Sequence, residues 1–165
     1  MTAALYQRDS YLREFDAVVT SSEGSAVTLN QTAFYPGGGG QPNDEGTMTI
    51  AGSELRVVGV RRQDGETWHE VLGLRAPTVG ITVRGTLDWE RRFALMRTHT
   101  ALHILCGVMH RDHGALVTGG NMTPLAARMD FEIEGVGDAF AEFAAEVEAR
   151  ANAEITAARP ISVGF

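Results

Sequence analysis

The chain has 165 residues, of which 44% are hydrophobic and 21% charged, and its formal net charge is −7 at pH 7. Such values are ordinary for a globular protein and exclude a disordered or fibrous chain, and the length suffices for one domain or two small lobes. The acidic charge excludes a protein that coats nucleic acid through a basic surface, because neutralising phosphates requires a positively charged face.

The sequence contains a single cysteine, which excludes a disulfide framework within the chain and agrees with a reducing compartment. The first residues lack the basic start and apolar core of a secretory signal, and no stretch approaches the roughly 20 apolar residues that span a bilayer. We therefore expect a cytoplasmic protein without a membrane partner.

The first half of the chain reads as short β-prone runs separated by turn residues such as SSEGS and QDG, without helical periodicity. This spacing is typical of a small antiparallel β-barrel, which we predict for residues 1–88. His69 lies in a β-hairpin context with no partner nearby in the sequence. The predicted strands are at residues 15–19, 26–31, 47–52, 55–60 and 81–87.

The pattern changes to helical at residue 89, with Asp88 as the expected N-cap and Gly114 as the expected end of a helix over residues 89–113. Two strand-like runs follow, and then a second helix over residues 138–154, before a tail that reads as a strand or connector. We predict an α/β domain over residues 89–165, giving an α+β protein. The strand-like runs are at residues 115–122 and 125–133, and the helical face expected to pack on a sheet consists of Phe140, Phe143, Val147 and Ala151.

His99 and His103 stand four residues apart in the first predicted helix, so their Cβ atoms lie about 5–6 Å apart on one face. Both imidazoles can reach one zinc ion from this spacing, although two histidines supply fewer ligands than a structural or catalytic zinc site needs. The alternative is two surface histidines without a metal. Cys106 is a candidate third ligand or a small buried apolar group, and the histidines that end the helix suit capping better than metal binding.

Four consecutive glycines follow Pro36 in the segment TAFYPGGGGQPNDEG, at residues 32–46. Glycine lets the backbone approach a ligand closely and offer its N–H groups at positive φ, so this loop can hold an anion or polarise a carbonyl. Gly39, Gly40 and Gln41 spell GGQ, which resembles the tripeptide that peptide release factors aim at a peptidyl-tRNA ester. The alternative is a flexible turn.

The basic residues are all arginines, and several of them cluster near the start of the first predicted helix. Planar guanidinium groups can bind phosphates through two hydrogen bonds, which favours a contact with RNA. A solvated helix surface is the alternative. The clustered residues are Arg84, Arg91, Arg92 and Arg97.

The glycine-rich segment and MRTHTALHIL together resemble the editing domains of alanyl-tRNA synthetases and the free-standing AlaX-type editing proteins. The segment GGNMTPLAARMDFE resembles a further strand of this family, so the likeness covers residues 15–165. It implies an N-terminal β-barrel followed by an α/β lobe of the threonyl- and alanyl-tRNA synthetase editing type. The family completes its metal site with a downstream Cys-x-x-x-His pair that this sequence lacks, and we expect a fragment rather than a natural short form.

The resemblance implies a zinc-dependent hydrolase that removes serine or glycine from mischarged alanine tRNA, with zinc as cofactor, tRNA as partner and no use of ATP. His99 and His103 would hold the metal, and Gln41 would orient the water or the ester carbonyl. Thr32 would read the hydroxyl group of serine. The backbone of Gly39 and Gly40 would bind the terminal adenosine, and Arg97 the tRNA.

Two other functions remain open from the sequence. The chain can be a tRNA-binding module of the same fold with impaired catalysis, or a zinc-dependent hydrolase of a small free ester or amide, which the acidic charge favours.

Overall fold

The computed structural model describes residues 2–73 and 77–161. The chain divides into two compact units, Met1–Ala94 and Leu95–Phe165, and each is described by itself. No helix among the described residues combines the length and the apolar character required to cross a membrane.

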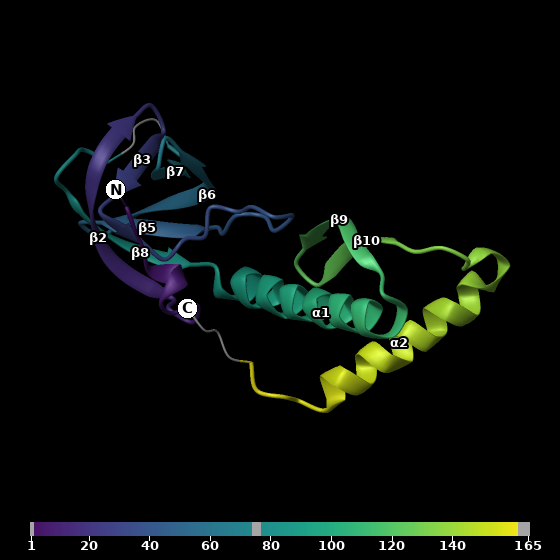
Figure 1. Ribbon diagram of the computed structural model, residues 1–165. Helices are drawn as coiled ribbons and strands as arrows, with labels where there is room; N and C mark the ends of the chain where they lie inside the picture. Colours follow the sequence, from purple (N-terminus) through teal and green to yellow (C-terminus); the bar gives the residue numbers. More distant parts are fainter. Residues whose placement is uncertain (1, 74–76, 162–165) are drawn as a thin grey trace. The chain divides into compact units, whose positions relative to one another are not determined.

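The first unit is a closed barrel of six strands in the order β2-β3-β7-β6-β5-β8, with every neighbouring pair antiparallel (Figure 1). This confirms the predicted barrel and adds one strand, β7. The sequence did not indicate this strand because the histidine at an inward position interrupts the alternation of apolar residues. The strands are β2 (Glu14–Glu23), β3 (Ala26–Leu29), β5 (Gly46–Ile50), β6 (Ser53–Gln63), β7 (Glu66–Val71) and β8 (Thr82–Leu87).

The interior of the barrel is filled by inward-facing side chains that alternate with exposed ones along the strands. In β2, for example, Phe15, Ala17 and Val19 are buried while the residues between them are exposed. Gly85 of β8 makes room for this packing, because a Cβ atom there would lie 2.5 Å from the ring of Phe15. The core also includes Val27, Leu29, Phe34, Met48, Val57, Val60, Val71, Val83 and Leu87.

Three short elements complete the first unit. β1 (Ala3–Ala4) pairs in parallel with β4 (Gln31–Thr32), and η1 (Leu5–Gln7) follows β1. β4 leads directly into the glycine-rich segment, which ends where β5 begins.

The long helix α1 (Trp89–His113) has the predicted bounds and both predicted end signals. At its start, the Asp88 carboxylate accepts a hydrogen bond from the Arg91 N–H at 3.0 Å. At its end, Gly114 takes a φ of 64°, which lets its N–H donate to the His110 carbonyl at 3.0 Å. The helix therefore begins and ends where its capping residues allow.

The second unit contains the antiparallel pair β9 (Leu116–Thr123) and β10 (Ala126–Glu132), then η2 (Gly137–Ala139) and the helix α2 (Phe140–Thr156). Its buried core is small and includes residues from α1, α2 and the chain between them. These residues are Val108, Met109, Ala115 and Val147, with Leu105, Phe131, Ile133 and Phe143 partly buried against them.

The predicted apolar face of α2 is only partly correct. Val147 is buried and Phe143 packs against the core, but Phe140 is 65% exposed, so the prediction that it faces a sheet is wrong. Phe140 begins α2 and is not among the residues that pack against this core. Beyond α2, the described residues 157–161 form a turn and a connector without a strand, and the rest of the predicted tail lies outside the described residues.

Arginine–carboxylate pairs also join α2 to the end of α1. Arg111 donates to Glu154 at 2.7 Å, and Arg150 donates to Asp112 at 2.8 Å. The two arginines hold the pKa of Asp112 well below its usual range, mainly through the hydrogen bond from Arg111. These charges supplement a small apolar contact.

Candidate active site

The glycine-rich segment folds into a tight hairpin whose tip is exposed. Gly38 and Gln41 exchange two backbone hydrogen bonds, of 2.9 and 3.1 Å, and Gly39 and Gly40 turn the chain between them with φ of 60° and 83°. Two successive positive φ values are typical of a type I′ turn and strongly favour glycine. Within the described residues, no backbone hydrogen bond uses the N–H groups of Gly39 or Gly40. These donors can therefore reach a ligand.

The base of this loop is closed by Tyr35 and Asp44. The N–H of Asp44 donates to the Tyr35 carbonyl at 3.0 Å, and the N–H of Tyr35 donates to the Asp44 carboxylate at 2.6 Å. Residues 36–43 therefore form a loop whose two ends are fixed to each other.

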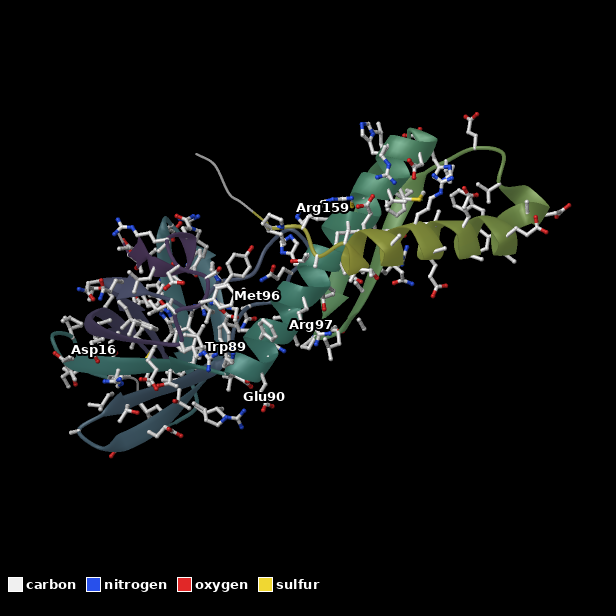
Figure 2. All side chains as sticks on the ribbon, turned by 90° about the horizontal axis from the view of Figure 1, so that it is seen from below. Asp16, Trp89, Glu90, Met96, Arg97 and Arg159 are labelled. Carbon is white, nitrogen blue, oxygen red and sulfur yellow. The ribbon has the colours of Figure 1, made fainter. Side chains whose placement is uncertain are left out.

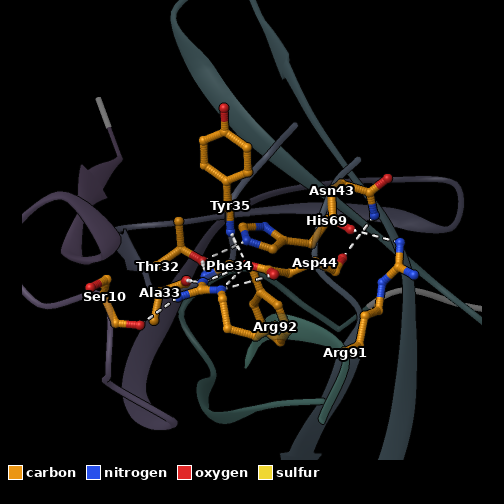
Figure 3. Close-up of polar contacts among 10 residues, drawn as sticks. All are labelled: Ser10, Thr32, Ala33, Phe34, Tyr35, Asn43, Asp44, His69, Arg91 and Arg92. Atoms are coloured by element: carbon orange, nitrogen blue, oxygen red, sulfur yellow. Dashed lines mark hydrogen bonds and ion pairs between the residues drawn. The ribbon is translucent and has the colours of Figure 1, made fainter. Parts of the chain in front are cut away.

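A buried ion pair fixes this loop base to α1. Arg92 is 4% exposed and Asp44 1%. The guanidinium donates to both carboxylate oxygens, at 2.9 Å from Nε to Oδ1 and 2.5 Å from Nη2 to Oδ2. It also donates to the carbonyls of Ser10, at 2.9 Å, and Ala33, at 2.6 Å (Figure 3). One side chain thus joins the chain before β2, the glycine-rich segment and the start of α1.

This arrangement corrects the prediction of phosphate binding for Arg92, because its guanidinium is buried and bonded within the protein. Arg91 donates to the Asn43 carbonyl at 3.1 Å and lies 3.4 Å from Glu45, and exposed Arg84 pairs with Glu14 at 2.5 Å. Arg97 is exposed on α1 (Figure 2).

Thr32 and His69 form a second buried polar contact, inside the barrel. Both side chains are 0% exposed, and the Thr32 hydroxyl lies 2.8 Å from Nε2 of His69. The same hydroxyl oxygen accepts a hydrogen bond from the Phe34 N–H at 3.1 Å. Nδ1 of His69 lies 3.3 Å from the Val27 carbonyl.

Burial lowers the pKa of His69 from its ordinary 6.5 to about 4, and the contact with the Val27 carbonyl opposes this shift only in part. The ring is therefore neutral near pH 7. A carbonyl oxygen can only accept, so Nδ1 carries the proton and Nε2 accepts from the Thr32 hydroxyl. The Thr32 side chain is bonded on both sides and has no surface to offer a substrate in this structure.

His99 and His103 lie in the second unit, one turn apart on α1. Their ring centroids are 4.8 Å apart and the rings are inclined by 16°. Partial burial lowers the pKa of His99, and the neighbouring His103 lowers it further, which favours the neutral form that ligates metals. Cys106 is half-buried, and burial raises the pKa of its thiol.

The donor set of these histidines fits two positions of a zinc site. Among the described residues, no group of three or more histidine, cysteine, aspartate or glutamate side chains is placed to hold a metal. The two imidazoles thus form part of a ligand set. The glycine-rich hairpin belongs to the first unit and the imidazoles to the second.

Sequence reasoning did not find the roles of Asp44, Arg92 and His69. Asp44 stands in PNDEG, which reads as a turn, and Arg92 in a run that reads as helix surface. His69 stands at an inward position of β7, and the sequence did not reveal this because a polar residue there breaks the apolar alternation.

Comparison with known proteins agrees with this fold. The family described as tRNA synthetases class II (A) matches residues 5–91. An alanyl-tRNA editing protein AlaX-M from Saccharolobus solfataricus is 44% identical over 136 residues, which is 81% of this chain and 58% of the relative. AlaX-M from Methanosarcina acetivorans is 40% identical over 99% of this chain and 69% of its own length. An alanine–tRNA ligase from Pyrococcus abyssi is 40% identical over 78% of this chain and 14% of its own.

The barrel and the family match define the class as a relative of the class II (A) tRNA synthetases. Within it, the chain belongs to the family of alanyl-tRNA editing proteins of the AlaX-M type. The chain spans 58–69% of the length of its AlaX-M relatives.

Replacing Arg92 by methionine should leave Asp44 buried without its counter-charge. We expect the free energy of unfolding to fall by about 3–5 kcal/mol. The matched control is Arg84→Met, which breaks the exposed pair with Glu14 and should lower the stability far less, because solvent screens an exposed ion pair. Urea unfolding measures both, and equal losses would show that the buried pair does not stabilise the barrel.

The stability of the protein should depend on pH through His69. Its pKa is about 4 when folded and 6.5 ordinarily, so the unfolded chain takes up a proton first as the pH falls. The stability is complete above about pH 6.5 and decreases toward about pH 4, by up to about 3 kcal/mol. Urea unfolding of the wild type and of His69→Gln is measured across this pH range. The difference between the two proteins gives the contribution of His69, because both contain the same titrating carboxylates. Parallel curves for the two proteins would contradict the assignment.

Proposed function

We propose that the protein hydrolyses the ester of mischarged alanine tRNA, with seryl- or glycyl-tRNA as substrate. The observation that carries the proposal is the identity of 39–44% with proteins named alanyl-tRNA editing protein AlaX-M. The exposed Gly-Gly-Gln hairpin and the paired imidazoles are the two features whose chemistry suits this reaction.

An aminoacyl ester is already reactive, so its hydrolysis needs mainly a positioned water and stabilisation of the oxyanion that forms on the carbonyl oxygen. The backbone of Gln41 is fixed by its pairing with Gly38, so its carboxamide starts from a defined point. In the proposed mechanism this carboxamide orients the water or the ester carbonyl. The N–H groups of Gly39 and Gly40 bind the terminal adenosine, and exposed Arg97 contacts the tRNA.

His99 and His103 would hold a zinc ion, and further ligands are needed to complete its coordination. When bound, zinc supplies a Lewis acid and lowers the pKa of a bound water. The two imidazoles, one helical turn apart, are two donors for it.

Discrimination between serine and alanine is efficient when a site rewards the hydroxyl group, because an analogue without it leaves polar groups unpaired. The hypothesis from the sequence gives this role to Thr32. In the folded barrel the Thr32 hydroxyl is bonded to His69 and to the Phe34 N–H, and direct reading of a substrate would require this arrangement to open. A role in positioning the loop agrees better with these contacts.

Substitution of His99 or His103 by alanine should abolish tight zinc binding and reduce seryl-tRNA deacylation by at least about a hundredfold. His110→Ala is the matched control, since His110 is exposed on the same helix and its backbone carbonyl still ends the helix. Atomic emission gives the zinc content and acid precipitation of labelled seryl-tRNA gives the rate. Retention of both zinc and activity in His103→Ala would exclude the proposed site.

Two other results of these assays would distinguish the alternative functions. Binding of seryl-tRNA without hydrolysis by the wild-type protein would favour a tRNA-binding module. Hydrolysis of a small ester that tRNA does not inhibit would favour a general esterase, because a tRNA-directed site must be competed by tRNA in a salt-dependent way.

The variant Thr32→Val distinguishes reading from positioning. Removal of a contact to the serine hydroxyl would reduce deacylation of seryl-tRNA and leave glycyl-tRNA unchanged. Loss of positioning should instead lower both rates by a similar factor, and this is the result we expect. Single-turnover assays with the two substrates measure the ratio, and a selective loss with seryl-tRNA would restore the role of Thr32 as the reader.

A further inference from the structure

We infer that His69 is a positioning residue for the glycine-rich loop and acts through Thr32 and Phe34 without touching the substrate. The effect on catalysis rests on the proposed function, whereas the effect on the loop itself does not. His69 belongs to neither of the features assigned above to binding or catalysis.

The first argument is the cost of placing a histidine where it stands. His69 is opposite two buried apolar residues in the ladder, Val27 of β3 and Val60 of β6. A buried imidazole must satisfy both ring nitrogens, so an apolar side chain of similar size would suit this position better for stability alone. The histidine therefore supplies something other than packing.

The second argument is the direction of its hydrogen bonds. The proton on Nδ1 faces the Val27 carbonyl, so Nε2 is an acceptor and orients the Thr32 hydroxyl toward itself. The Thr32 oxygen then presents a lone pair to the N–H of Phe34. One neutral ring in β7 thereby fixes a backbone amide 35 residues earlier in the chain, where the glycine-rich segment starts.

The third argument is that the ring of Phe34 is held by the same surroundings. It contacts the rings of His69 and Phe15 edge-on, at centroid distances of 5.7 and 5.6 Å. Gly46 leaves the space it needs, because a Cβ atom there would lie 2.9 Å from Cε1 of Phe34. The backbone and the ring of Phe34 are thus both fixed, immediately before Tyr35 closes the loop base with Asp44 (Figure 3).

The test compares His69→Leu with His69→Gln. Leucine removes the acceptor, and we expect exchange of the Phe34 amide hydrogen to accelerate at least about tenfold. The kcat for deacylation should fall about tenfold or more with a smaller change in KM, because a small displacement of catalytic groups acts mainly on the chemical step. The glutamine carboxamide oxygen can accept from the Thr32 hydroxyl, so His69→Gln should restore most of both. Thr32→Val removes the same bond and provides the measurement if His69→Leu does not fold.

The matched control is Val83→Ala, which creates a cavity elsewhere in the barrel core. The two variants are compared at equal loss of stability. If His69→Leu changes the Phe34 amide exchange rate and kcat no more than Val83→Ala does, His69 has only a structural role and the inference is overturned. Unchanged Phe34 exchange in His69→Leu overturns it as well. If the wild-type protein does not deacylate seryl- or glycyl-tRNA, the proposed function fails, and the Phe34 exchange rates alone decide the role of His69.

Discussion

The buried contact between Arg92 and Asp44 is the interaction on which the first unit depends. A buried guanidinium needs partners for its donors, and each of the three guanidinium nitrogens of Arg92 donates a hydrogen bond, to one carboxylate and two carbonyls from separate parts of the chain. Because Asp44 also accepts from the Tyr35 N–H, the same contact closes the glycine-rich loop. The start of α1 and the base of the loop are therefore fixed together.

The two buried polar contacts, Arg92 with Asp44 and Thr32 with His69, fix the two ends of the glycine-rich loop. Apolar packing in a barrel is non-directional and tolerates many arrangements of the connecting segments, whereas hydrogen bonds fix the orientation of particular groups. Asp44 with Arg92 holds the end of the glycine-rich loop, and Thr32 with His69 holds its beginning. Between these anchors, the hairpin tip consists of glycines whose φ values other residues rarely adopt. The protein thus combines a rigid support with an exposed backbone.

Much of the fold was predictable because its signals are local. The β-prone runs and the turn residues between them indicated the barrel strands, and Asp88 and Gly114 indicated the ends of α1. The buried pairs could not be predicted, because Arg92 and Asp44 are 48 residues apart and Thr32 and His69 are 37 apart. Charge and turn propensity assign such residues to the surface unless a partner is known. The prediction of an apolar face on α2 was right for Val147 and wrong for Phe140. Periodicity indicates which residues share a face of the helix, but it does not indicate how far the surface that covers this face extends.

The attachment of α2 also has a consequence for the order in which the protein loses structure. Val147 and Phe143 give this helix little apolar contact, and the arginines that pair with Asp112 and Glu154 are about half exposed to solvent. Attraction between such charges weakens as dissolved ions screen them. A rise in ionic strength therefore loosens α2 from α1 first, while the barrel, whose ion pair is enclosed, keeps its shape.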